Sequence, residues 1–418
     1  MAQRNNSEIV SVVHRICCGL DVHKEMIEAC LLRSDGVGGQ SMELRHFATF
    51  TDDLLRLREW LLEHECPIVA MESTGVYWRP VHNILEGHIE VILVNARHIK
   101  NVPGRKTDVE DSKWLAGLLR HGLLRGSFIP PHEVRQWRDL TRLRRSYVES
   151  LSDYKRRTHK LFETANIKID SVVSDLFGTT GRNLMALLIT GTDFTPADIA
   201  KCACGKLKSK QEALYRAIQG FFTDHHRYLL SLLLETIAVF ETQIESLNAR
   251  LRTLMSSREP LLERLMEVAG ISEVSARAIL AEIGPTLDTF RSSAALCSWA
   301  GLCPGNHESA GKRHSGKSPV RKHHLKTIMI EVAWAAIKVK ASYYRDKYYR
   351  LKTRRGPKKS ILAIAHRLMK AIYHIIKNGA RFHDLGEAFL TQKYAPVKLA
   401  RLKKQAHQLG FDLVAQVA

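Results

Sequence analysis

The chain has 418 residues, enough for two or three domains that each bury a core. It carries 63 Lys and Arg against 43 Asp and Glu, and this net charge of +20 favours a polyanionic partner such as nucleic acid. The best candidate for a membrane span, residues 228–240, is too short to cross a bilayer, and no apolar signal-peptide segment precedes the first strand. The eight cysteines form no disulfide or zinc pattern, so we expect a protein of the reducing cytoplasm.

Residues 14–124 are predicted to form an α/β unit that begins with strands. Three strand-like runs come first, and helices then alternate with strands. The predicted strands are 15–22, 26–32, 46–50, 67–71 and 89–95, and the predicted helices are 52–64, 76–86 and 111–124. This is the element order of the ribonuclease-H-like fold, which we therefore predict for the N-terminal domain.

Two long helical stretches follow. The first, residues 134–165, is strongly basic, with nine Lys and Arg against three acids between 135 and 160. The second runs from about 212 to 257. With little else between them, they predict an antiparallel helical hairpin that links two domains, and a plain helical bundle is the alternative. From Leu261 onward the chain is predicted to be helical, apart from a Gly-, Ser- and Lys-rich loop at 301–322.

Four acids stand at the ends of predicted elements. Asp21 ends the first strand in ICCGLDVHK, Glu72 ends another in VAMESTG, and Asp108 and Asp111 open a helix in RKTDVEDSKWLAGLL. In a ribonuclease-H-like sheet the first and fourth strands are neighbours and the last helix packs across them, so the four carboxylates would converge. Carboxylate oxygens are the ligands that Mg²⁺ prefers, and two such ions can clamp a phosphodiester.

Each acid also has a purely structural interpretation. Asp108 could cap the helix and Asp111 could complement the helix dipole. Asp21 could be a turn residue, and Glu72 could stand at the entry to a helix. The order of the acids along the chain, which is the order the fold requires, favours the metal site.

The C-terminal half contains a candidate helix-hairpin-helix element. In residues 267–282 a turn at Gly270 separates two short helices, and backbone N–H groups in such a turn can bind a phosphate. An ordinary helical turn with a glycine C-cap is the alternative.

The loop that follows is the second basic feature. From Gly311 to Lys326 it holds six Lys and Arg and three His, with no acid. A serine among such cations is a candidate nucleophile, because its alkoxide and a pentavalent phosphate would both be stabilised. A solvated flexible loop is the alternative.

A tyrosine-rich basic stretch, ASYYRDKYYRLKTRRGPKKS, comes next. Between Lys338 and Lys377 there are 13 Lys and Arg and one acid, Asp346, so phosphate contact is expected. The tyrosines could stack on bases or act as nucleophiles, or they could be half core and half surface.

These motifs together resemble one family of transposases. GLDVHK, the MESTG strand end with Tyr77 and Trp78 after it, and the KTDVEDS element resemble its DEDD domain. The stretch from VAGI through AEIG to AALCSWAGLCPGNHESAGK is similar to its C-terminal transposase domain. The family is the IS110 family of insertion-sequence transposases, also called bridge recombinases, and the resemblance covers roughly residues 15–380.

The resemblance implies four parts. They are a RuvC-like DEDD metal-dependent domain at 14–130, a helical coiled-coil linker at 131–257, a C-terminal transposase domain at 258–380 and a basic tail at 381–418. It also implies Mg²⁺ as the divalent metal cofactor. The family's tetrad carries over onto Asp21, Glu72, Asp108 and Asp111.

In this family a serine forms a covalent link to DNA. The family's Ser-Gly-Gly-Lys matches Ser309-Ala310-Gly311-Lys312, so Ser309 is the implied nucleophile. Two departures keep Ser315 in reserve: Ala310 replaces a usual glycine, and Arg321-Lys322-His323-His324 lacks the glycine often found after the next basic element. The expected nucleic-acid contacts are Gly270, Lys312, Arg313, Lys317, Arg321, Lys322 and Lys326.

The implied partners are donor and target DNA, a guide RNA encoded by the element, and further copies of the chain in a dimer or tetramer, with no membrane. The expected location is the bacterial cytoplasm, in association with the nucleoid. Two other functions compete with this one. The first is a metal-dependent junction nuclease in which the serine is incidental, and the second is a DNA-binding protein without catalysis.

Overall fold

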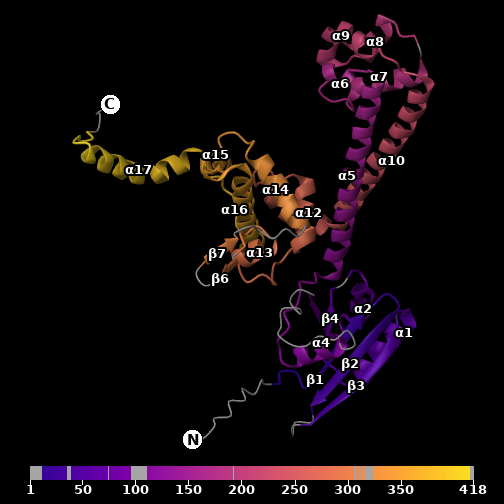
Figure 1. Cartoon of the computed structure of the whole chain (residues 1–418), viewed down its shortest axis with the longest axis vertical. Helices are drawn as coiled ribbons and strands as arrows, with labels where there is room; N and C mark the ends of the chain where they lie inside the picture. Colours follow the sequence, from indigo (N-terminus) through magenta and orange to yellow (C-terminus); the bar gives the residue numbers. More distant parts are fainter. Residues whose placement is uncertain are drawn as a thin grey trace. The chain divides into compact units, whose positions relative to one another are not determined.

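The computed structural model describes residues 12–34, 39–73, 75–95, 111–191, 193–305, 307–309, 312–315 and 323–414. The chain forms two compact units, Met1–Ile129 and Pro130–Ala418, each with its own hydrophobic core (Figure 1). The finer division of the chain into four parts stays a prediction.

The N-terminal unit is a five-stranded mixed sheet with helices on both faces (Figure 1). Its strands are β1 (Ile16–Val22), β2 (Met26–Ser34), β3 (Gln40–Ala48), β4 (Ile68–Glu72) and β5 (Glu90–Val94). They lie in the order β3-β2-β1-β4-β5, antiparallel from β3 to β1 and parallel from β1 to β5. This is the ribonuclease-H-like, RuvC-like sheet, and the predicted fold is confirmed.

Helices α1 (Thr51–Glu63) and α2 (Trp78–Leu85) cover one face of this sheet, and α4 (Asp111–Arg120) covers the other. The predicted bounds of the third strand, 46–50, were wrong, since β3 begins at Gln40 and ends at Ala48. As an edge strand with mostly exposed side chains, β3 has no apolar run to mark where it begins.

In the second unit, α5 (His132–Thr164) and α10 (Asp224–Leu254) pack along each other as an antiparallel hairpin (Figure 1). The predicted single helix over 212–257 was wrong, because α9 (Gln211–Ala217) ends before α10 begins. Between them, a Cβ on Gly220 would lie 2.3 Å from the carbonyl oxygen of Ala165, so the chain passes tightly against the end of α5. Thr223 and His226 then form the capping box that starts α10.

A small helical subdomain lies at the closed end of the hairpin (Figure 1). It consists of α6 (Ile169–Val172), α7 (Thr179–Thr190), α8 (Pro196–Cys202), the 3₁₀ helix η1 (Gly205–Lys210) and α9. Its core includes Ile167, Leu184, Met185 and Leu214, together with Phe162 of α5. The expectation of little structure between the long helices was wrong, because helices of 4 to 12 residues leave no long periodic pattern.

After Leu254, the residues that the structure describes are helical apart from one pair of short strands. Its elements are η2 (Ser256–Arg258), α11 (Glu259–Met266), α12 (Glu273–Ile283), α13 (Ser293–Trp299), β6 (His307–Ser309), β7 (Lys312–Ser315), α14 (His324–Ala336), α15 (Tyr343–Arg355), α16 (Pro357–Asn378) and α17 (Ala388–Gln408). The predicted helical C-terminal region is confirmed, with the antiparallel pair β6–β7 as an addition. Among the described helices, none is long and apolar enough to cross a membrane.

Candidate active site

Asp21 lies near the end of β1 on the face of the sheet that α4 covers. Side chains alternate along a strand, so Cys17, Gly19 and Asp21 face α4, whereas Leu20 and Val22 face the core beneath α1 and α2. The side chain of Asp21 is 26% exposed, which places its carboxylate at the rim between the core and solvent.

Gly19 allows α4 to approach β1 closely. A Cβ at this position would lie 2.1 Å from the carbonyl oxygen of Ser112 and 2.5 Å from the backbone nitrogen of Ala116. The backbone of α4 therefore rests directly on β1, and only a glycine leaves room for it. Because α4 begins at Asp111, this packing brings that acid next to Asp21.

The electrostatics of Asp21 reflect both its burial and its neighbouring acids. Burial raises the pKa of the Asp21 carboxyl, and the negative charges of Asp111 and Glu28 raise it further. His23 acts in the opposite direction, because its Nε2 lies 3.1 Å from Asp21 Oδ2. Glu28 stands directly opposite Asp21 in the β1–β2 register and was not predicted as part of the site.

Glu72 is the last residue of β4, the parallel neighbour of β1. The two strands pair Gly19 with Ala70 and Leu20 with Met71. Asp21 and Glu72 are the next residues of the two strands, so they lie beside each other at the same end of the sheet. Ala70 belongs to the core beneath α4, and Glu72, two residues on, faces the same side. The sheet thus places Glu72 on the face and at the edge where Asp21 lies.

Asp108 lies outside the described residues, so three members of the predicted tetrad have a place in the structure. Counting only the positions that the structure describes, no group of three or more His, Cys, Asp and Glu is arranged to hold a metal ion. The structure brings Asp21 and Asp111 together and sets Glu72 on the adjacent strand.

Ser309 is the last residue of β6. The β6–β7 register pairs it with Lys312 and pairs His307 with Ser315. Ser309 and Lys312 are therefore backbone partners in an antiparallel pair of strands, and Arg313 follows in β7. Lys317, Arg321 and Lys322 lie outside the described residues.

The two ends of the basic loop are anchored side by side. The ring of His323 meets that of Trp299 edge-on at 4.6 Å between centroids. Lys326, in the first turn of α14, has its Cδ 3.7 Å from where a Cβ on Gly301 would stand. Burial lowers the pKa of His324, and the positive charge of Arg142 on α5 lowers it further. The residues at the two ends of the loop are therefore packed against each other.

Gly270 has a packing role in this structure. Its φ is +84°, and a Cβ would lie 2.5 Å from both the carbonyl oxygen of Val332 and the backbone nitrogen of Ala336. The turn between α11 and α12 therefore sits against the backbone of α14. Ser272 caps α12 in a capping box with Ser275. Contact of this turn with a phosphate stays a prediction.

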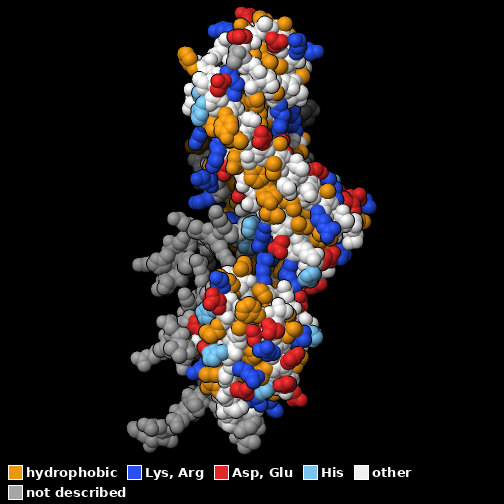
Figure 2. Space-filling model, turned by 90° about the vertical axis from the view of Figure 1, so that its right-hand side faces the viewer, with side chains coloured by type: hydrophobic (Ala, Val, Ile, Leu, Met, Phe, Trp, Pro, Cys, Tyr) orange, Lys and Arg blue, Asp and Glu red, His pale blue; other side chains and the backbone are white. Residues whose placement is uncertain are grey.

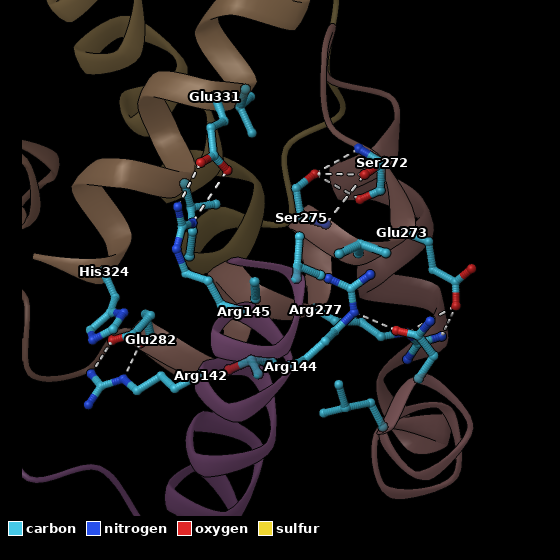
Figure 3. A pocket seen from close by; sticks show the side chains of 18 of the residues that line it. Arg142, Arg144, Arg145, Ser272, Glu273, Ser275, Arg277, Glu282, His324 and Glu331 are labelled. Atoms are coloured by element: carbon cyan, nitrogen blue, oxygen red, sulfur yellow. Dashed lines mark hydrogen bonds and ion pairs between the residues drawn. The ribbon is translucent and has the colours of Figure 1, made fainter. Parts of the chain in front are cut away.

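A cavity of about 360 Å³ lies among α5, α10, α12 and α14, and sequence reasoning missed it (Figure 3). Its walls are lined with arginines that pair with acids on neighbouring helices. Arg142 makes two hydrogen bonds of 2.9 Å to Glu282, and Arg145 makes one of 2.9 Å to Glu331. These pairs fasten α5 to α12 and to α14, so the cavity marks a junction of helices.

Part of the basic charge of α5 is therefore used inside the protein. Arg138 also donates to the backbone carbonyl oxygens of Ala281 and Glu282 on α12. Positions 138, 142 and 145 share one helix face, and this spacing was the signal that the sequence offered.

The tyrosine-rich stretch is half core, as one of its two interpretations held. Tyr343, Tyr344 and Tyr348 are buried, whereas Tyr349 is half exposed. Burial raises the pKa of Tyr344 well above its ordinary value, which makes its phenol a poor nucleophile. On the face drawn in Figure 2, Lys and Arg side chains are scattered with acids between them.

Comparisons with known proteins identify the chain. Residues 18–167 match a DEDD-type family model described as transposase, and residues 262–350 match the model of the transposase IS116/IS110/IS902 family. Among solved structures it is similar to RuvC of Thermus thermophilus, with 13% identity and a TM-score of 0.21, over 27% of this chain and 99% of that one. RuvC of T. thermophilus in complex with a Holliday junction substrate matches at 12% identity, with the same TM-score and coverage. No curated protein matches the sequence.

The two transposase matches lie in different parts of the chain and follow each other in the order that the sequence motifs predicted. With the RuvC-like sheet in the N-terminal unit and helices in the second, the chain belongs to the IS110 family of transposases.

Proposed function

We propose that this transposase cleaves and exchanges DNA strands with two chemical groups, a divalent-metal site at the end of β1 and a serine nucleophile in loop 301–322. Membership of the family establishes DNA transposition as the activity. The observation that carries the proposed metal site is the packing of α4 on Gly19, which brings Asp111 beside Asp21.

The residues at this edge fit a divalent cation such as Mg²⁺, which the DEDD family implies. The donors are carboxylate oxygens, and their mutual repulsion at Asp21 is what a cation would relieve. Asp21, Glu72, Asp108 and Asp111 would hold the metal, and when bound it would supply positive charge to a phosphodiester undergoing displacement. His23 steadies the Asp21 carboxylate through its 3.1 Å contact with Oδ2.

In the proposed serine chemistry, each bond from phosphorus to oxygen that breaks is replaced by a new one. Ser309 Oγ attacks the phosphorus, a bond from Oγ to phosphorus forms, and the bond to the leaving DNA oxygen breaks, with that oxygen taking up a proton. A terminal hydroxyl of the partner strand then attacks the phosphoserine and releases Ser309. The register of β6–β7 supports Ser309, because it pairs this residue with the cation Lys312.

Covalent adduct formation tests the serine. Ser309→Ala should eliminate the protein–DNA adduct seen on a denaturing gel with labelled DNA, and Ser315→Ala should only slow its appearance. Ser318→Ala, the third serine of the loop, is the matched control and should leave the adduct unchanged. Loss of the adduct in either of the other two variants, with Ser309→Ala active, would move the nucleophile. Strand cleavage without any adduct in the wild type would favour a metal-dependent nuclease.

The metal site has its own test. Asp108→Asn and Asp21→Asn should each abolish recombination while DNA binding stays within a few-fold of the wild type. Full activity in these variants, or in excess chelator, contradicts the proposed site. If the wild type binds DNA but transfers no strand in Mg²⁺, the protein would instead be a DNA-binding protein without catalysis.

We also propose that a guide RNA encoded by the element is bound. The net charge of +20 supports it, because internal ion pairs use only part of the cations. Exposed lysines such as Lys206, Lys208 and Lys210 of η1 are positioned where they could contact the phosphates of a nucleic acid. Protein purified from cells that carry the whole element should retain a discrete RNA that high salt releases. Site-specific recombination that survives RNase treatment contradicts this proposal.

A further inference from the structure

Glu28 makes a direct contact with the start of α4. It lies in β2 opposite Asp21, and its side chain is on the face that carries Cys30 and Leu32 in the core beneath α4. Its Oε1 accepts a hydrogen bond of 2.6 Å from the hydroxyl of Ser112. Ser112 is fully buried and follows Asp111 directly in the chain.

This hydrogen bond joins β2 to the first turn of α4. The donor is a buried hydroxyl and the acceptor is a carboxylate, so the bond is of the stronger, charge-assisted kind. Glu28 also places negative charge beside the N-terminal turn of the helix, where the helix dipole favours it. Both effects hold the start of α4 at one position against the sheet.

Two fixed points then determine where Asp111 lies. Gly19 of β1 sets how closely α4 approaches the sheet, through its contacts with the Ser112 carbonyl and the Ala116 nitrogen. Glu28 of β2 holds the side chain of Ser112, one residue after Asp111. With both contacts made, the Asp111 carboxylate stays beside that of Asp21.

We infer that Glu28 is a positioning residue of the proposed metal site, which acts through Ser112 to keep Asp111 in place beside Asp21. This inference rests on the proposed function, because it assigns Glu28 a role toward a metal that Asp21 and Asp111 hold. Glu28 acts here as a hydrogen-bond acceptor and does not itself ligate the metal. Its carboxylate accepts the Ser112 hydrogen bond, so the role requires an acceptor oxygen at this position, and the negative charge strengthens the bond.

The test measures Mn²⁺ affinity of the full-length protein by titration calorimetry. Glu28→Ala and Ser112→Ala should each weaken binding by about 10-fold, as loss of a residue that orients a ligand does. Glu28→Gln keeps a carbonyl oxygen for the Ser112 hydroxyl and should stay within about 3-fold of the wild type. Glu28→Ala combined with Ser112→Ala should be no weaker than the poorer single variant, because both remove the same hydrogen bond.

Glu25→Ala is the matched control, because Glu25 is an acid in the turn between β1 and β2 with its side chain 87% exposed. It should bind Mn²⁺ as the wild type does. A weak Glu28→Gln variant together with a normal Ser112→Ala variant would make Glu28 a ligand and overturn the inference. Normal affinity in Glu28→Ala would overturn it as well.

Asp21→Asn distinguishes failure of this inference from failure of the proposed function on which it rests. If Asp21→Asn loses Mn²⁺ binding while Glu28→Ala keeps it, the positioning role alone fails. If the wild type itself does not bind Mn²⁺, the metal site and the positioning role fail together. Circular dichroism melting of each variant shows that the fold is intact, and Glu28→Gln supplies a readout where Glu28→Ala is too unstable.

Discussion

At the scale of single residues, the geometry of the acidic cluster depends on Gly19. The strand that carries Asp21 has a glycine where its neighbours on the same face are a cysteine and an acid. Any side chain there would push α4 away from β1 and move Asp111 from Asp21. Gly19 is therefore expected to matter to the proposed site as much as the acids do.

We expect Gly19→Ala to lower the free energy of unfolding by about 1–3 kcal/mol, the usual cost of overpacking a core. The same variant should lose most recombination activity, since α4 carries Asp111. Thermal melting and a recombination assay measure the two effects.

Gly117→Ala is the matched control for that experiment. Gly117 lies in α4, the helix that packs on Gly19, and nothing stands within 4 Å of an added Cβ there. Alanine is the better helix former, so this variant should gain about 0.5–1 kcal/mol of stability and keep its activity. A Gly19→Ala protein as stable and active as Gly117→Ala would show that the close approach of α4 is not needed.

At the scale of elements, α5 is attached to the C-terminal helices by a buried carboxylate. The Glu282 side chain is 3% exposed and pairs with Arg142 at 2.9 Å and Arg138 at 3.5 Å, both on α5. Ion pairs as well as apolar contacts thus join the α5–α10 hairpin to α12. Removing one partner from such a pair leaves a buried charge without compensation.

Glu282→Ala should therefore reduce the free energy of unfolding by about 3 kcal/mol, the lower end for buried pairs because Arg142 is partly exposed. Glu331→Ala is the control, since its side chain is 60% exposed and its pair with Arg145 should contribute under about 1 kcal/mol. Urea unfolding of the two variants makes the comparison. Equal losses would mean that burial of Glu282 does not strengthen the junction.

The sequence predicted those candidate site residues whose position follows from where an element ends. Asp21, Glu72 and Asp111 were predicted because strand ends and helix starts are visible as changes in periodicity. Glu28 was not predicted, because it lies in mid-strand and its partner Ser112 is 84 residues away. The Arg142–Glu282 pair was missed for the same reason, since its members are 140 residues apart.

The fold of each unit was predictable to a different extent. The N-terminal sheet followed from the order of its elements, whereas the bounds of its edge strand did not. The subdomain between α5 and α10 was missed, because its short helices pack on one another and on Phe162 in a core that no single segment reveals. The exposed edge strand lacks an apolar run to mark its start, and the helices of the subdomain are too short to leave a periodic pattern.

At the scale of the whole molecule, the acids and the serine belong to different units of the chain. Asp111 lies in the first unit and Ser309 in the second. Between them run α5 with 33 residues and α10 with 31, each roughly 45–50 Å long at the rise of an α-helix. A hairpin can return the chain toward its start, so this length permits a site within one subunit or between two.

We predict that the site forms between subunits, with the acids of one copy and Ser309 of another. The family resemblance implies an assembly of several subunits on two DNA partners, and a site completed only on assembly would leave a lone subunit harmless. Asp21→Ala and Ser309→Ala proteins, each inactive alone, are co-expressed so that mixed oligomers form, and recombination is measured. Partial recovery is expected, because some mixed assemblies combine the intact acids of one subunit with the intact serine of another. If each site lies within one chain, every site still lacks its acid or its serine and activity stays at zero. That result, with mixed oligomers demonstrated by differential tagging, rejects the shared site.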